Sequence, residues 1–213
     1  MHPSARRTKE SLILIPWNNN LPKLKPFAFL LILSVCVASV ATASTASNGL
    51  VYSTASSTVV QPQPSTGSCH ATGSGLYQEP DMKCTPGALN PAVTQATIYS
   101  TICKSGWTST IRPSSSITSK EKKASLSAYG IKSSTSGYEY DHDVSLELGG
   151  AANDPRNLWP EPDYPGVTHS FYLNPKDHVE DALNHLVCNK QMTLSQAQHL
   201  IATNWVAAYH TYG

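Results

Sequence analysis

The sequence predicts a small, disulfide-braced α+β domain with a ββα core and a pair of helices at its C-terminal end. Three observations predict it. A β-like run over residues 138–144 leads into a Gly-Gly turn, two amphipathic helical segments lie between residues 175 and 209, and four cysteines lie outside the apolar N-terminal region. About 135 residues, from Glu79 onward, are enough for one modest hydrophobic core.

The N-terminal region has the pattern of an export signal. Residues 27–43 form an apolar run that follows Lys23 and Lys25 and ends in the small residues Ala41-Thr42-Ala43. This predicts a secretory signal peptide over residues 1–43. The run is also close to the shortest membrane-spanning helix, about 17 residues, so an uncleaved anchor at residues 27–43 is the alternative. We expect a secreted protein with no membrane partner after processing.

The segment after the signal is poor in large apolar side chains. Residues 44–75 consist mainly of Ser, Thr, Gly and Pro with scattered Val and Ala. This composition predicts a flexible linker over residues 44–78, and hence a compact domain over residues 79–213.

The cysteine count agrees with export. Cys36 lies inside the apolar run and leaves with it, so an even set of four remains: Cys69, Cys84, Cys103 and Cys188. Three pairings are possible, and we favour Cys69–Cys84, which is local, with Cys103–Cys188, which joins two ends of the core. No CxxC pair is present, which argues against a structural zinc site.

The charge balance limits the mode of nucleic-acid binding. Residues 1–43 contain five of the fifteen basic residues and one of the fourteen acidic residues, so their removal changes the net charge from +1 to about −3. Proteins that hold nucleic acid through many phosphate contacts are normally basic. Binding here would need a local patch or a metal ion.

Three segments precede the central motif. Residues 92–103 mix β-branched and polar residues and predict a short helix or strand. Residues 107–112 alternate in the manner of a strand, and residues 119–129 predict a charged helix.

The motif strands and the two final helices come next. Residues 138–144 predict the first strand, and residues 157–159 mark the second. Residues 175–189 predict a helix with Pro early and acids in its first turn. Residues 193–209 predict another helix, opened by a Ser195-x-x-Gln198 capping box.

The residues of the central motif suit phosphodiester hydrolysis. Asp141 and His142 place an acid beside a base at a strand end, Gly149-Gly150 turns the chain back, and Asn157 follows fifteen positions after the histidine. A neutral histidine can deprotonate water, and a hard divalent cation on oxygen ligands can stabilise the developing charge. This layout is that of the HNH, or ββα-metal, nuclease motif.

The resemblance extends over most of the chain. YEYDHDVSLELGGAANDPRNLWPEP, residues 138–162, resembles an exported HNH-type family that reads roughly Y-E-x-D-H-L-I-P-L-E-L-G-G-x-x-x-x-P-x-N-L-W-P-E. The likeness continues upstream from Pro86 and downstream to Tyr209. It implies a metal-dependent endonuclease acting on DNA or RNA, with a divalent cation such as Mg²⁺.

The resemblance also implies roles for single residues. His142 resembles the general base, Asp141 the strand metal ligand, and Asn157 the Asn that stabilises the loop. The family's helix carries a Lys-Asp-x-x-Glu pattern, seen here as Lys176, Asp177 and Glu180. Asp177 is the first choice for the next metal ligand, then Glu180, His178 and Asp181. Cys103 and Cys188 occupy family positions that fit their pairing.

Other readings of the same residues stay open. Arg112 and Arg156 could contact phosphate, or form structural ion pairs. Asp143 stands where the family has an apolar residue; it would raise the pKa of His142 or recruit a second cation. The alternative function is a catalytically inactive HNH-like binding module, and a surface protein that binds only metal is a third.

Overall fold

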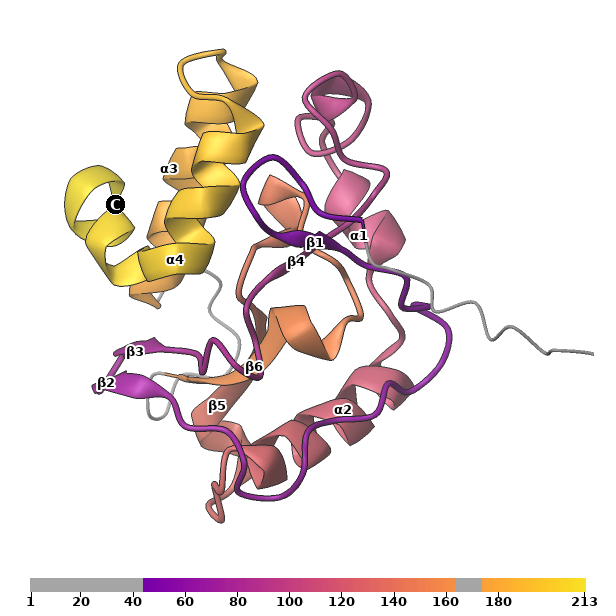
Figure 1. The fold of residues 1–213 in the computed structure, drawn as a ribbon, viewed down its shortest axis with the longest axis vertical. Coiled ribbons are helices and arrows are strands. Elements are labelled where there is room, and N and C mark those ends of the chain that lie inside the picture. The colour runs from indigo at the N-terminus through magenta and orange to yellow at the C-terminus, as the bar shows by residue number, and fades with distance from the viewer. Residues whose placement is uncertain (1–43, 164–173) are drawn as a thin grey trace, which may run out of the picture. The chain divides into compact units, whose positions relative to one another are not determined.

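The computed structural model describes residues 44–163 and 174–213. The predicted signal peptide or anchor lies outside these ranges. Within them, no helix has the length and apolar character needed to cross a membrane. The helices and strands are β1 (Val51–Tyr52), β2 (Thr72–Ser74), β3 (Tyr77–Glu79), β4 (Ala88–Leu89), α1 (Trp107–Ile111), α2 (Ser115–Ala128), β5 (Tyr138–His142), β6 (Leu158–Pro162), α3 (Pro175–Cys188) and α4 (Leu194–Tyr212). The chain therefore forms a small mixed α/β domain (Figure 1).

An antiparallel pair of strands, β5 and β6, lies at the centre of the motif. Their register places Asp141 opposite Trp159 and His142 opposite Leu158. The loop between them turns at Gly149, whose φ of 78° is in the left-handed region. At Gly150 a Cβ atom would lie 1.7 Å from the Val144 carbonyl oxygen, so only glycine fits there. The Gly-Gly turn is thus required by a close backbone approach.

Two helical predictions agree with the structure and two details do not. The helices over residues 119–129 and 175–189 are present as α2 and α3. Residues 107–112 were predicted as a strand but form α1 and its C-terminal cap, Arg112. No strand in the described part of the chain pairs with them, and Pro113 holds Arg112 in the extended conformation that ends the helix. The capping box of α4 is formed by Thr193 and Gln196, not by Ser195 and Gln198.

The main core lies between α3, α4 and the loop that follows β5. Figure 1 shows α3 and α4 side by side, and Val179, Leu183 and Val187 turn one stripe of α3 into this core. On α4, Ile201 and Trp205 are buried in the same cluster. The predicted C-terminal helical pair is therefore confirmed, and it closes one side of the motif.

Residues 44–78, for which the sequence predicts a flexible linker, are instead held against the domain. β1 pairs in parallel with β4, and β2 pairs with β3. The Ser53 hydroxyl donates to Asp154, and the Asn48 amide donates to Gln198. The segment has few large apolar residues, but backbone pairing and side-chain hydrogen bonds hold it in place.

Both predicted disulfides are present. Cys69–Cys84 spans 15 residues and fixes the segment before β2 to the chain after β3, while Cys103–Cys188 spans 85 residues and joins the loop before α1 to the end of α3. Two disulfides fit an oxidising, extracellular setting.

The two disulfides should contribute unequally to stability. A cross-link stabilises mainly by restricting the unfolded chain, so a Cys103→Ser/Cys188→Ser protein should lose about 4–5 kcal/mol of unfolding free energy. The matched Cys69→Ser/Cys84→Ser protein should lose about 3 kcal/mol, because its loop is shorter. Urea unfolding measures both. A larger loss of unfolding free energy in the Cys69→Ser/Cys84→Ser protein would contradict the view that each disulfide acts by restricting the unfolded chain.

Candidate functional site

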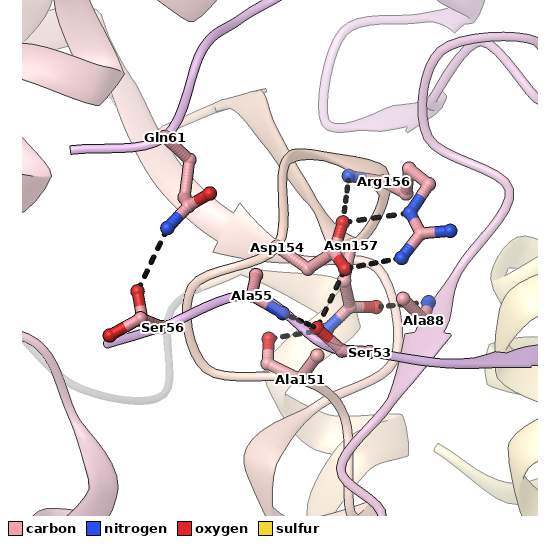
Figure 2. A network of polar contacts seen from close by, with 9 residues as sticks. All are labelled: Ser53, Ala55, Ser56, Gln61, Ala88, Ala151, Asp154, Arg156 and Asn157. Atoms are coloured by element: carbon pink, nitrogen blue, oxygen red, sulfur yellow. Dashed lines mark hydrogen bonds and ion pairs between the residues drawn. The ribbon is translucent and has the colours of Figure 1, made fainter. Parts of the chain in front are cut away.

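The side chain of Asn157 holds the loop between β5 and β6 in place through hydrogen bonds to backbone groups. Its Nδ2 donates to the carbonyls of Val144 (3.0 Å) and Ala151 (3.1 Å), and its Oδ1 accepts from the amides of Val144 (2.9 Å) and Ala88 (3.3 Å). Figure 2 shows this side chain between Ala88 and Ala151. Asn157 is fully buried and both ends of its amide are used. Its position is that of the loop-stabilising Asn, and it has no remaining group for catalysis.

His142 is placed at the end of β5, where it lines a cleft of about 640 Å³. Its Nε2 lies 3.2 Å from the Ala152 carbonyl oxygen. A carbonyl can only accept a hydrogen bond, so Nε2 carries the proton and Nδ1 keeps its lone pair. Burial lowers the pKa of His142 to about 4, although the charge of Asp141 opposes this. The imidazole is therefore neutral over the physiological pH range.

Lys176 joins the first turn of α3 to the end of β5. Its buried Nζ donates to Asp141 Oδ2 (2.7 Å), to the carbonyl oxygen of His142 (2.6 Å) and to Glu180. Burial alone would lower the pKa of Lys176, but the charge of Asp141 and then that of Glu180 hold it well above its ordinary value. The ammonium is thus a fixed positive charge next to the end of β5.

Asp141 is held from two sides. Besides the contact with Lys176, it forms a hydrogen bond with the side chain of Glu161, which is on β6. Burial raises the pKa of Glu161 well above its usual range, and the charge of Asp141 adds to this, so Glu161 carries the proton and donates it. Burial would also raise the pKa of Asp141, but Lys176 and Glu161 together keep it below its ordinary value. Asp141 is ionised and fully engaged.

The predicted metal ligands do not form a metal site in this arrangement. Asp141 and Glu180 both bind the Lys176 ammonium, and Asp177 lines the cleft apart from that contact. Within residues 44–163 and 174–213, no group of three His, Cys, Asp or Glu side chains is close enough to hold a metal ion.

The cleft is lined mainly by acidic side chains. Seven carboxyl groups and two basic groups, Arg112 and Lys122, contribute to its wall. The acidic residues are Glu139, Asp141, Glu147, Asp163, Asp177, Glu180 and Asp181. Burial raises the pKa of Glu147 to about 7, and the neighbouring carboxyl of Asp181 adds to this. At neutral pH, Glu147 can therefore hold or release a proton.

The two arginines, Arg112 and Arg156, have different surroundings in the structure. Arg112 lines the cleft, whereas Arg156 does not. Arg156 binds Asp154 through Nε (3.0 Å) and Nη2 (2.6 Å), and Ser53 donates to the same carboxylate, as Figure 2 shows. Arg156, predicted to bind substrate, forms the structural ion pair that was the alternative.

Two central groups had no predicted role. Lys176 was visible only as part of the family pattern, although its spacing of four from Glu180 places both on one face of α3. Glu161 was missed because an acid on a strand is usually read as solvent-facing. Asp143 lies in a cavity separate from the cleft, and the pKa of His142 is lowered rather than raised.

Comparison of the chain with protein-family models, curated proteins and solved structures finds no match.

Replacing Asn157 should loosen the loop that positions His142. Asn157→Asp removes two buried N–H donors and brings a carboxylate oxygen to two carbonyls, so we expect a loss of about 3 kcal/mol or more. Asn189→Asp is the matched control, because this exposed amide donates to only one carbonyl, that of His185. It should change stability by less than about 0.5 kcal/mol. Equal urea midpoints for the two variants would contradict the role of Asn157.

Removing the Lys176 charge should destabilise the protein in a pH-dependent way. Lys176→Met leaves buried carboxylates unpaired, so we expect a loss of about 3–5 kcal/mol at pH 7. The pKa of Asp141 is lower in the folded state, so the stabilisation by the pair is present above the unfolded pKa of about 3.9 and is lost as pH falls through the folded value. The deficit should therefore shrink below about pH 4.

The matched control for this experiment is Lys120→Met. Lys120 is exposed on α2 and its removal should alter stability by less than about 0.5 kcal/mol at any pH. Unfolding curves between pH 3 and 7 test both variants. A Lys176→Met deficit that is constant over this range would show that the loss is one of packing and not of charge.

Proposed function

We propose that this protein is a secreted HNH-type, or ββα-metal, nuclease that hydrolyses phosphodiester bonds of DNA or RNA. The observation that carries the proposal is the state of His142: a neutral imidazole in a cleft, with Nε2 anchored on Ala152 and Nδ1 keeping its lone pair. A fixed imidazole of this kind can take a proton from an attacking water. The chain order of β5, β6 and α3 also fits the resemblance, and so do the hydrogen bonds by which Asn157 holds the loop between the strands.

The proposed reaction uses two groups of the cleft. His142 Nδ1 accepts a proton from water as the water oxygen forms its bond to phosphorus, and the bond from phosphorus to the leaving oxygen breaks. Glu147, whose pKa is raised to about 7 by burial, can supply the proton to that leaving oxygen. Pairs of groups with separated pKa values are typical of acid–base sites. Arg112, which lines the cleft, would contact the phosphate.

A divalent cation such as Mg²⁺ is part of the proposal, for an electrostatic reason. A nucleic acid entering the cleft brings phosphates toward seven carboxyl groups and only two basic side chains. Divalent cations from solution would reduce this repulsion. Because the predicted ligands do not form a metal site, no chemical step is assigned to the metal.

The acidic lining also favours a second candidate, an inactive module that keeps the HNH framework and binds a partner. A concave surface with this charge attracts a cationic ligand, such as a basic peptide, without any change in the protein. The two candidates differ in turnover and in the sign of the partner's charge.

A nuclease assay on the purified, oxidised protein separates the candidates. Plasmid DNA and RNA are tested with Mg²⁺, Mn²⁺ or EDTA, beside His142→Ala and the exposed control His178→Ala. The nuclease proposal predicts cutting that His142→Ala abolishes and His178→Ala keeps. No cutting by a folded sample, together with binding of a basic peptide, would establish the binding module instead.

The pH dependence of cutting should follow His142. With a pKa of about 4, the imidazole is in its active neutral form at all higher pH values, so the rate should rise from pH 3 to about 5 and show no further rise up to about 6.5. It should fall near and above pH 7, where Glu147, with a pKa of about 7, loses the proton that it supplies to the leaving oxygen. Single-turnover rates between pH 3.5 and 7 on a short oligonucleotide measure this. A rate that rises tenfold per pH unit up to about 6.5 would show an unburied histidine.

A further inference from the structure

A second cavity, of about 260 Å³, lies apart from the cleft, between residues 79–83 and the middle of α4. Asp143 lines it, although its chain neighbour His142 lines the cleft. The cavity is therefore next to the end of β5, but it is distinct from the cleft that His142 lines.

The carboxylate of Asp143 has no hydrogen-bond partner among the described residues. Asp143 as a whole residue is 1 % exposed, and neither Oδ1 nor Oδ2 has a hydrogen-bond partner among the residues that the structure describes. Burial raises the pKa of Asp143 well above its usual range, and Lys176 only partly opposes this. Protonation does not resolve the problem, since the resulting O–H would still lack an acceptor. A buried polar group in this condition needs a partner that the side chains do not supply, such as an ordered water or an ion.

Glu79, at the end of β3, contributes a second carboxylate to the same cavity. Its Oε1 is buried without a partner in the described part of the chain, while the side chain accepts a hydrogen bond from the Val206 backbone amide. One oxygen of Glu79 is thus fixed by α4, and the other stays available beside the cavity.

The middle of α4 adds backbone oxygens. Asn204 is extended, with φ −165° and ψ 85°, which breaks the helix. The Ala207 amide donates to Asn204 Oδ1 at 2.6 Å, and the Val206 amide donates to Glu79. In a regular helix these amides would donate to the carbonyls of Thr203 and Ala202. The first half of α4 thus ends at the cavity wall, where the amides that would normally bond to the Ala202 and Thr203 carbonyls donate to side-chain oxygens instead. The carbonyl end of a helix segment is electronegative.

The surroundings of Gly87 show that Asp143 and α4 lie close to each other. A Cβ atom on Gly87 would lie 3.1 Å from Asp143 Oδ2 and 3.3 Å from Ala202 Cβ. The Asp143 carboxylate and the broken turn of α4 therefore meet beside a residue that has no side chain.

We propose that Asp143, Glu79 and the carbonyl end of the first half of α4 form a binding site for one hard divalent cation, of the Ca²⁺ class. Carboxylate and carbonyl oxygens are the ligands that Ca²⁺ prefers, and water completes its shell. The basic side chains near the cavity, His70 and Lys83, act on the charge of Asp81, whose carboxylate also accepts hydrogen bonds from their backbone amides. Neither is among the charges that act on Asp143, which Lys176 offsets only in part. With two carboxylates in the site, affinity should be that of a weak extracellular site, about 0.1–1 mM.

Terbium luminescence tests the site, because Tb³⁺ replaces Ca²⁺ and Trp205 lines the cavity as an indole donor. The full chain, purified in its oxidised form, is titrated with Tb³⁺ under excitation of tryptophan, and Ca²⁺ is then added as competitor. Asp143→Asn removes the charge with little change of shape, and half-buried Glu79→Gln is the second variant, in case the first fails to fold. Asp181→Asn, in the cleft, is the matched control.

The proposal predicts a Tb³⁺ signal that Ca²⁺ displaces, weakened about tenfold or more in Asp143→Asn and in Glu79→Gln and unchanged in Asp181→Asn. Thermal unfolding of the wild type should also shift upward with Ca²⁺, and that of the two variants should not. Absence of a displaceable signal up to about 5 mM, beyond the weak end of such sites, would overturn the proposal. So would equal binding by both variants, or loss of the signal only in Asp181→Asn.

Discussion

The Lys176 ammonium is the contact on which the candidate site depends. It is the point where α3, through Glu180, meets the end of β5, through Asp141 and the His142 carbonyl. A buried charge is tolerated only when its hydrogen bonds are complete, and three oxygens complete those of this ammonium. The direction of α3 relative to the strand pair is therefore set by charge as well as by the apolar stripe of the helix.

A second set of contacts, made by Asn157, fixes the loop that follows the strand. Asn157 fixes the loop from Val144 to Ala151, and Ala152, the next residue, presents its carbonyl to His142. Lys176 thus sets where the histidine backbone lies, and Asn157 sets where the acceptor for its ring lies. Together they fix the tautomer and orientation of the imidazole, which is the property that a general base requires.

Much of this could be predicted from the sequence, because the patterns involved are local. The stripe of α3, the Gly149-Gly150 turn and the place of Asn157 each follow from spacing within a short segment. The role of Lys176 could not be derived in this way, since its partners Asp141 and His142 lie 35 and 34 residues away and become neighbours only in the fold. Residues 44–78 have the same explanation, since Ser53, for example, binds Asp154 about 100 residues downstream. Arg156 is a different case: its partner Asp154 is only two residues away, and the sequence alone does not show which way the guanidinium turns.

The protonation state of His142 tests the account most directly, and long-range proton–nitrogen NMR of the imidazoles measures it, with His142→Gln to assign the signals. His142 should stay neutral, with the proton on Nε2, and should not titrate between about pH 5.5 and 8, because its pKa is about 4. Titration near pH 6.5, or a proton on Nδ1, would show that the ring is not held as described and would remove the basis for His142 as the general base.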